Sequence, residues 1–398
     1  MKWKNTWKYL PVNYNTSIGY LENATQTTIF KNNLRGEKVR LLFSNRYAKE
    51  PLTLEKVYIG KEDADGNVSS FVPVTSKGQG KINIPAGEEF YSDEMPFAIL
   101  PGQNIVLSVY FKEKTPLQSA VSVWSTFACR TFYKTNCEDI CTDTPNEDWK
   151  ASHQIFPYAD ADVHKPNIVA GVCAIGLYTD DFVKTVALFG DSITHMSYFS
   201  DPLLGLFIKE EKGKICIENY GIGGNRILRD ASYFPEMEGD GICFGPAALS
   251  RFENDVFSGD KPDCLMLLEG VNDIMHPYVF DHKDEIVTSK DLQEGLAQLI
   301  SIAHKHETPV FLGTIMPFCQ PPMQDWYKES EDTRNGCNQW IRESSDADAI
   351  LDYDLAIRDK KNTAFMAEDT HLGDWLHPDE NGGSIMANLA YKIWKQKQ

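Results

Sequence analysis

Apolar and polar residues alternate at every second position through much of the chain before residue 180. This period is typical of strands that bury one face, and it predicts strands at residues 38–45, 54–60, 104–111 and 119–127. Turn-forming residues separate them, at Asp65-Gly66, Pro85-Ala86-Gly87 and Pro101-Gly102. Because no long apolar stripe at helical spacing occurs there, we predict that residues 1–180 form an N-terminal β-sandwich of jelly-roll-like type.

From about residue 183 onward, short apolar runs alternate with amphipathic segments. The apolar runs predict strands buried on both faces, at residues 185–189, 215–219, 264–268, 310–313 and 349–352. Strands that alternate with helices in this way form a mostly parallel sheet covered on both faces. We therefore predict that residues 181–398 form an α/β domain, a flavodoxin-like three-layer fold around a five-stranded parallel sheet.

Two helices of this second domain are marked by their apolar faces. One face, behind a capping box of Thr288 and Asp291, consists of Leu292, Leu296, Leu299, Ile300 and Ala303. The face of the last helix consists of Ile385, Met386, Leu389, Ile393 and Trp394. Since ligands of open α/β sheets bind beyond the carboxyl ends of the strands, we expect the functional side chains at that edge.

Length and charge narrow the classes of protein. A chain of 398 residues exceeds the size at which one hydrophobic core keeps growing, which agrees with two domains. The formal net charge is −18, and no stripe of lysine or arginine reverses it locally, so nucleic acid is not an expected partner. No apolar run approaches the roughly 18 residues of a transmembrane helix, so no membrane span is expected.

Nine cysteines, an odd number, are scattered mostly through apolar segments. Such usage is typical of reduced thiols in a cytoplasmic protein, and the N-terminal residues lack the apolar core of an export signal. Cys137 and Cys141 form the only close pair, and no second Cys or His pair accompanies them at zinc-finger spacing. We therefore expect a cytoplasmic protein without a metal site.

Ser192 stands directly after the first strand of the second domain, in the segment Gly190-Asp191-Ser192. This position places a hydroxyl at the edge where ligands of such sheets bind. A serine at a strand end is more often only the N-cap of the next helix, so its position alone does not identify a nucleophile.

Asp374 and His377 lie three residues apart on a loop just before the last helix. A histidine acts as a general base when a carboxylate holds its other ring nitrogen, and this spacing allows that contact. The alternative is a solvated loop in which the aspartate only caps a turn.

An acyl-transfer enzyme also needs hydrogen-bond donors for the developing oxyanion. The glycine-rich segment 219–225 follows the second strand, and Asn272 follows the third. A dinucleotide-binding loop is the alternative for the glycine segment. We consider it a poor fit, because Arg226 occupies the third glycine position and the segment follows the wrong strand.

These four segments, FGDSIT, NYGIGGN, GVND and DWLHP, resemble the sequence blocks of the SGNH (GDSL) hydrolase family, in the order that family uses. The resemblance implies that Ser192 is the nucleophile, with Asp374 and His377 completing the triad. It also implies an oxyanion hole made by the backbone amides of Ser192 and Gly224 and the side chain of Asn272.

The resemblance covers nearly the whole chain. Segments such as RFENDVF, GTIMPF and DAILDYD resemble a subgroup of GDSL-like lipase/acylhydrolases that carry an N-terminal β-domain. Three further residues are candidates for the substrate pocket. His195 could shape the pocket or lie on a helix surface, His276 could form part of its wall, and Trp375 could line the acyl site or pack beneath its loop.

The expected function is therefore that of a serine esterase that hydrolyses carboxylic esters through an acyl-enzyme, with no cofactor. By analogy with sugar-binding sandwiches, we expect a small-acyl (acetyl) esterase acting on an oligosaccharide or another small ester. The alternatives are a lipase or thioesterase for longer acyl chains, and a sugar-binding module with a relict active site. The sandwich could equally be a lid or a dimer surface, so a homo-oligomer stays open.

Overall fold

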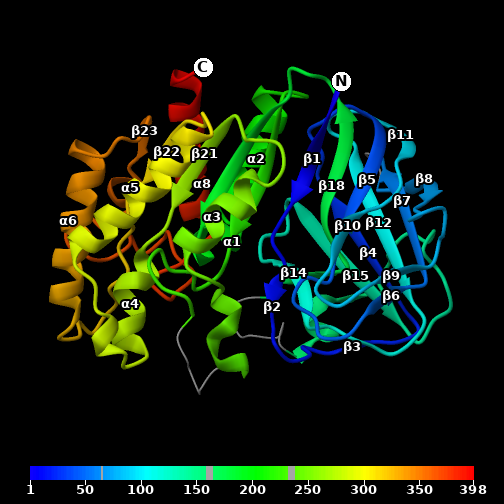
Figure 1. The fold of residues 1–398 in the computed structure, drawn as a ribbon, viewed down its shortest axis with the longest axis horizontal. Helices are drawn as coiled ribbons and strands as arrows, with labels where there is room; N and C mark the ends of the chain where they lie inside the picture. The colour runs from blue at the N-terminus through cyan, green and yellow to red at the C-terminus, as the bar shows by residue number, and fades with distance from the viewer. Residues whose placement is uncertain (64–65, 158–164, 232–237) are drawn as a thin grey trace. The chain divides into compact units, whose positions relative to one another are not determined.

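The computed structural model describes residues 1–63, 66–157, 165–231 and 238–398. It divides into two compact units (Figure 1), one made of residues 1–184 with 207–218, the other of residues 185–206 with 219–398. Segment 207–218 is tied into the first unit by Asn33, whose side chain donates to the carbonyl of Ile215 (2.8 Å) and accepts from the amide of Gly213 (3.1 Å). In the predicted turn at Asp65-Gly66, Asp65 lies outside the described residues.

The first unit consists mostly of strands in antiparallel sheets, as predicted. Its strands are β1 Lys2–Lys8, β2 Val12–Asn13, β3 Tyr20–Leu21, β4 Ala24–Phe30, β5 Gly36–Ser44, β6 Leu52–Leu54, β7 Lys56–Glu62, β8 Val68–Pro73, β9 Ile82–Ile84, β10 Glu89–Tyr91, β11 Met95–Ile99, β12 Asn104–Phe111, β13 Thr115–Pro116, β14 Ser119–Val123, β15 Cys129–Thr135, β16 Lys150–Ala151, β17 Asn167–Ala170 and β18 Val172–Thr179. A short 3-10 helix, η1, spans Ser152–Gln154. The two larger sheets have the orders β1-β18-β5-β10, with β11 also on β5, and β16-β15-β4-β12-β7-β8.

The bounds of two predicted strands differ from the observed ones, because the chain changes its pairing strand in one case and loses it in the other. The alternating run 54–60 is split at Glu55, since Leu54 pairs with β9 whereas the residues from Lys56 onward pair with β12. The run 119–127 ends as a strand at Val123, which pairs with Asn167, the first residue of β17. The predicted strand 104–111 coincides with β12.

The predicted five-stranded sheet is present, with the strand order β20-β19-β21-β22-β23, and apart from the first residue of β19 and the first four of β20 it lies in the second unit. Its strands are β19 Lys184–Gly190, β20 Ile215–Gly221, β21 Cys264–Leu268, β22 Val310–Gly313 and β23 Ala349–Leu351. In order along the chain this is 2-1-3-4-5, the flavodoxin-like arrangement. Strands β19, β21, β22 and β23 pair in parallel.

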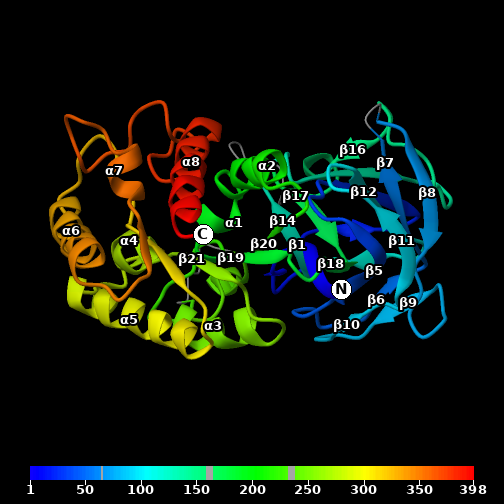
Figure 2. The same cartoon turned by 90° about the horizontal axis from the view of Figure 1, so that it is seen from above.

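Helices cover both faces of this sheet. They are α1 Ser192–His195, α2 Ser200–Glu210, α3 Ala248–Phe257, α4 Val271–Val279, α5 Ser289–Lys305, α6 Tyr327–Glu343, α7 Tyr353–Ile357 and α8 Glu380–Gln396, with 3-10 helices η3 Glu238–Phe244 and η4 Lys283–Glu285. Figure 2 shows α3 and α5 on one side of the sheet and α8 on the other. The three-layer α/β prediction is thus confirmed.

The predicted capping box is present at the start of α5, where Thr288 and Asp291 exchange hydrogen bonds. The buried face of α8 is only partly the predicted one. Met386 and Trp394 are buried, but the other buried positions of the helix are glycines and alanines. A Cβ at Gly383 would lie 1.9 Å from the carbonyl oxygen of Tyr198, so small residues let this helix approach its neighbours closely.

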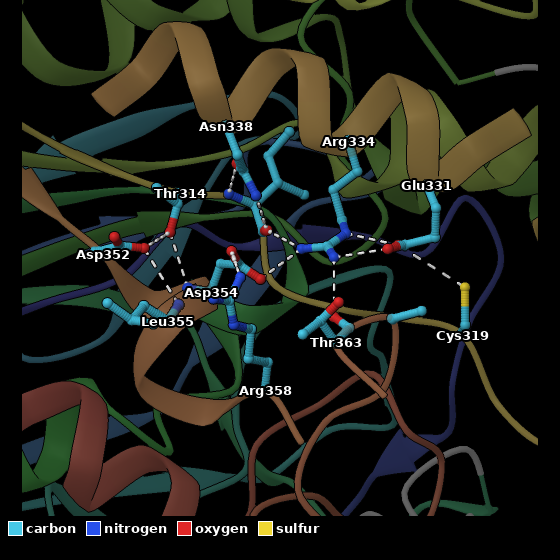
Figure 3. Close-up of polar contacts among 12 residues, drawn as sticks. Thr314, Cys319, Glu331, Arg334, Asn338, Asp352, Asp354, Leu355, Arg358 and Thr363 are labelled. Carbon is cyan, nitrogen blue, oxygen red and sulfur yellow. Dashed lines mark hydrogen bonds and ion pairs between the residues drawn. The ribbon is translucent and has the colours of Figure 1, made fainter. Parts of the chain in front are cut away.

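A buried ion-pair cluster fixes the segments that follow β22 and β23 (Figure 3). The fully buried side chain of Arg334, on α6, donates to both carboxylate oxygens of Glu331 (2.6 and 2.8 Å) and to Asp354 (2.7 Å). It also donates to the backbone carbonyls of Ile315 and Thr363, both at 3.1 Å. One guanidinium therefore joins α6, α7 and two loops.

Asp354, on α7, is the second centre of this cluster. Its carboxylate also accepts from Arg342 (2.5 Å) and Arg358 (3.1 Å), and its own amide donates to the hydroxyl of Thr314 (2.8 Å). Three arginines thus surround one fully buried carboxylate. Such a charge is tolerated because it is paired and hydrogen-bonded on every side.

In the part of the chain that the structure describes, no helix combines the length and apolar character needed to cross a membrane. All nine cysteines lie in described segments, and none of them forms a disulfide.

Substitution of Arg334 by Met is expected to lower the free energy of unfolding by about 3–5 kcal/mol, because it leaves the buried Glu331 carboxylate without its cation. Urea unfolding followed by fluorescence and circular dichroism measures the change. The matched control is Arg229→Met, at an exposed arginine of the same unit, where a change within about 0.5 kcal/mol is expected. Equal effects of the two substitutions would contradict the structural role of the cluster.

Candidate active site

Ser192 lies at the carboxyl end of β19, where the chain turns sharply into α1. Asp191 caps this short helix by accepting a hydrogen bond from the amide of Ile193 (2.9 Å). The turn needs a glycine at position 190, because a Cβ there would lie 2.1 Å from the carbonyl oxygen of Leu268 on the neighbouring strand. Ser192 is partly exposed, whereas Asp191 and Ile193 on either side are buried.

The structure brings together the three residues that the sequence predicted as a triad. The Ser192 hydroxyl lies 2.8 Å from Nε2 of His377, and Nδ1 of His377 lies 2.6 Å from Oδ2 of Asp374. The other oxygen of Asp374 accepts from the backbone amides of Leu376 and His377, both at 3.0 Å. This geometry places the ring proton on Nδ1 and leaves Nε2 to accept from the serine.

Asp374 is held in its charged form by these contacts. Burial alone would raise the pKa of its carboxyl, but the hydrogen bonds from the His377 side chain and from the two amides lower the pKa well below its usual range. The carboxylate therefore stays negative and can stabilise a cationic imidazole.

The glycine-rich segment 219–225 passes close to α1. A Cβ at Gly221 would lie 2.5 Å from the backbone nitrogen of His195, and the amide of Gly223 donates to Nδ1 of His195 (3.1 Å). Gly224 has a φ of +74°, and a Cβ there would lie 2.1 Å from the ring of Phe244. The glycines therefore serve close approach and a left-handed turn.

His195 is only 2% exposed, so the interpretation as a helix-surface residue is wrong. A polar side chain at this depth needs a partner, and the amide of Gly223 supplies one. His195 thus fixes the glycine segment relative to Ser192.

Asn272 and Asp273, at the start of α4, both contact the glycine segment or the residues that follow it. The Asn272 side chain donates to the carbonyl of Asn225 (3.0 Å), which uses one of its two amide hydrogens. Asp273 accepts from the amides of Ile227 (2.7 Å) and Leu228 (3.1 Å). Asp273 therefore binds a loop other than its own turn.

Arg251, on α3, holds this edge of the sheet together. Its buried guanidinium donates to the carbonyls of Gly190 (3.2 Å) and Tyr220 (2.9 Å) and to the side chain of Asn225 (2.8 Å). Asn225 in turn donates to the carbonyls of Phe244 and Pro246. Sequence reasoning missed the role of Arg251, because an arginine on an amphipathic helix usually lies at the surface.

The other two pocket candidates are His276, four residues after Asn272, and Trp375, between Asp374 and His377. His276 is buried, and burial lowers its pKa to about 3, so it is neutral. Its ring lies 5.1 Å from that of Phe244, the residue that contacts Gly224. Trp375 is half-buried next to Asp374, and its indole packs on His371, 4.4 Å between ring centroids.

Buried carboxyls underlie the site. Burial raises the pKa of Asp191, Glu269 and Asp273, the last to about 6. Both carboxyl oxygens of Glu269 are buried without a hydrogen-bond partner among the described residues. In the same described part of the chain, no group of three or more His, Cys, Asp or Glu residues is arranged to hold a metal ion.

Asp273→Asn tests the electrostatics of this edge. Burial raises the folded-state pKa of Asp273 from 3.8 to about 6. Between about pH 4 and 6 the folded protein therefore keeps a proton on this carboxyl that the unfolded chain releases. The free energy of unfolding falls as the pH rises through that window. The variant lacks this titration, so the stability of the unmodified protein relative to the variant should fall by about 3 kcal/mol from pH 4 to pH 7. Urea unfolding at each pH measures the difference.

A control of opposite sign is available at Asp291, whose pKa is lowered by its hydrogen bonds from Thr288. Stability of the unmodified protein relative to Asp291→Asn should rise as the pH rises through the region below about 4. A pH-independent difference for Asp273→Asn would show that its carboxyl is not perturbed.

Comparison with known protein families gives a match for the second unit. The sequence model of the GDSL-like lipase/acylhydrolase family matches residues 188–384, which include Ser192, Gly224, Asn272, Asp374 and His377. No curated protein matches the sequence.

Solved structures with a similar fold include two hydrolases. The acetylxylan esterase Axe2 from Geobacillus stearothermophilus is 17% identical, with a TM-score of 0.40, over 53% of this chain and 93% of that chain. A GDSL-like lipase from Bacteroides thetaiotaomicron is 16% identical, with a TM-score of 0.38, over 54% of this chain and 89% of that chain. The family match, together with the parallel sheet and the blocks at its carboxyl edge, leads to one conclusion: residues 188–384 form a hydrolase domain of the GDSL-like lipase/acylhydrolase family.

Proposed function

We propose that the second unit is a serine esterase in which Ser192 attacks the carbonyl carbon of a carboxylic ester. The observation that carries the proposal is the chain of two hydrogen bonds from the Ser192 hydroxyl through His377 to Asp374. In the first step, Nε2 of His377 takes the hydroxyl proton as Oγ bonds to the carbonyl carbon. The protonated imidazole then gives that proton to the departing alcohol, and an acyl-enzyme remains.

The second step uses water in place of the alcohol. His377 takes a proton from the water as the water oxygen attacks the acyl carbon, and returns a proton to Oγ of Ser192 as the acid leaves. Asp374 stays ionised throughout and stabilises the imidazolium, as its lowered pKa allows. The reaction needs no redox step and no cofactor.

The proposed oxyanion hole consists of the backbone amides of Ser192 and Gly224 and the side chain of Asn272. The amide of Gly223 already donates a hydrogen bond to His195. Gly224 is therefore the next residue that can donate its amide to a substrate. Asn272 has a second amide hydrogen beyond the one that it donates to Asn225. Preorganised donors of this kind are worth about 3–4 kcal/mol each in the transition state.

Ser192→Ala should lower kcat for p-nitrophenyl acetate by about 10⁴-fold or more, because the variant has no nucleophile for His377 to activate. The control is Ser384→Ala, which removes a serine hydroxyl from the partly exposed face of α8 and should leave kcat within about twofold of the unmodified enzyme. Esterase activity that survives in the purified Ser192→Ala protein would overturn the proposal, because the activity would then not depend on Ser192. The alternative of a sugar-binding module with a relict active site would in that case remain.

We propose further that the ester carries a short acyl group on a carbohydrate. The ring of Phe244 fills the space next to Gly224 and packs on His276, which limits the room beside the proposed oxyanion hole. A cavity of about 740 Å³ follows the glycine segment, and its lining mixes apolar residues such as Leu228 and Leu249 with charged and polar ones such as Arg229, Asp230 and His282. The polar and charged side chains of this lining can hydrogen-bond the hydroxyls of a sugar.

The hydrolysis of p-nitrophenyl acetate, butyrate and octanoate separates this proposal from a lipase or thioesterase for longer chains. The value of kcat/KM should be highest for acetate and about tenfold or more lower for octanoate. Phe244→Ala should raise the ratio of butyrate to acetate hydrolysis, because it enlarges the space beside Gly224. A steady rise of kcat/KM with chain length would favour the lipase or thioesterase, and a panel of acetylated oligosaccharides tests the carbohydrate part.

A further inference from the structure

The residues Asp374 and His377 lie on a six-residue loop, 372–377, that is closed at its base. The amide of Leu372 donates to the carbonyl of His377 (2.9 Å), and His371 forms a β-bridge with Pro378. The loop therefore leaves and re-enters the fold at one point. Its inner conformation therefore depends on hydrogen bonds made by the loop and by the residues that close it.

Two side chains accept hydrogen bonds from the inner amides of this loop. Asp374 accepts from the amides of Leu376 and His377. His371 accepts from two other amides of the loop, since its Nδ1 lies 3.0 Å from the amide of Gly373 and 3.2 Å from that of Trp375. Backbone groups of an irregular loop need such partners when they are buried.

The contact with Trp375 holds a backbone conformation that a tryptophan rarely adopts. Trp375 has a φ of +60°, in the left-handed region, which costs a residue with a Cβ about 1–2 kcal/mol. Its amide donates to His371 Nδ1, and its indole packs on the His371 ring (4.4 Å between centroids) and more distantly on Phe365 (5.5 Å). His371 therefore contacts both the backbone and the side chain of Trp375. Strain of this kind persists only where the surroundings enforce it.

We propose that His371 is a positioning residue of the active site, and that the lone pair of its Nδ1 sets the loop conformation that presents His377 to Ser192. This inference rests on the proposed esterase function. Because both contacts are donated to Nδ1, the ring is the neutral tautomer with its proton on Nε2. His371 is 8% exposed and does not contact the reacting atoms, so it acts only through the loop.

A merely structural role, in which the ring fills space beneath Trp375, makes a different prediction. Asparagine places its Oδ1 close to the position of Nδ1 and can accept the same two amides, but it lacks the ring. Phenylalanine keeps the ring and its packing on Trp375, but it has no acceptor. Glutamine carries the same amide as asparagine one carbon further out, beyond the position of Nδ1.

The three variants His371→Asn, His371→Phe and His371→Gln are compared for hydrolysis of p-nitrophenyl acetate by the full-length protein. We expect kcat to fall about 10- to 100-fold in the Phe and Gln variants, with KM within about twofold, because a displaced base slows the chemistry and not the binding. The Asn variant should keep kcat within about threefold of the unmodified protein. If the Phe variant does not fold, the Asn and Gln variants still test the inference. Both side chains carry an amide, so a difference in kcat between them reports the position of the acceptor and not the polarity of the side chain.

A spectroscopic measurement tests the same inference without turnover. The proton in the short His377–Asp374 hydrogen bond should give a far-downfield proton resonance. That resonance should be present in the unmodified protein and in the His371→Asn variant, and absent in the His371→Phe and His371→Gln variants. The control is His304→Phe, which replaces a half-exposed histidine of α5 and should keep the resonance.

The outcomes distinguish this inference from the proposed function. Equal kcat in all variants, or loss of activity in the Asn variant together with the Phe variant, would overturn the positioning role while the esterase remains. If the Ser192→Ala protein is as active as the unmodified protein, the proposed function itself fails. In that case the downfield resonance still reports whether His371 sets the loop.

Discussion

The buried guanidinium of Arg251 is the contact on which the arrangement of the candidate active site depends. It donates to the carbonyl oxygens at the carboxyl ends of β19 and β20 and to Asn225, and its charge is balanced by Asp255 (3.2 Å). The carbonyl of Gly190 also accepts from the amide of Ile222 (3.0 Å), so a backbone hydrogen bond joins the same two segments. Together with that backbone bond, the side chain of Arg251 holds the turn that carries Ser192 next to the glycine-rich segment.

The loops of the site are held in a second way, by side chains that accept hydrogen bonds from backbone amides. Asp191 binds the amide after Ser192, His195 binds that of Gly223, and Asp273 binds two amides beyond the glycine segment. Asp374 and His371 do the same for the loop that carries His377. Each loop is irregular, so its amides cannot be paired in a helix or sheet, and nearby acceptors fix its shape instead.

Patterns of neighbouring residues in the sequence predicted the features of the fold that depend on neighbouring residues. The parallel strands follow from short apolar runs, and the start of α5 follows from the capping box of Thr288 and Asp291. The structure also brings Ser192, Asp374 and His377 together, although they are distant in the chain. Features that depend on non-local contacts were not predictable in this way. The break at Glu55 depends on which strand is the neighbour, and the burial of Arg251 depends on carbonyls from two other strands.

Within this one site, hydrogen bonds and burial shift the pKa values of carboxyl groups in opposite directions. Asp374 receives hydrogen bonds from an imidazole and two amides, and these hold its pKa low in spite of burial. Asp191, Glu269 and Asp273 are buried near the carboxyl ends of the strands. Burial raises the pKa of all three carboxyls, and for Asp191 and Asp273 it outweighs the hydrogen bonds that they accept. Contacts and burial, and not residue type, therefore decide which carboxyl keeps its charge. The one carboxylate stabilised as an anion is the one that contacts His377, which is where a negative charge supports proton transfer from Ser192.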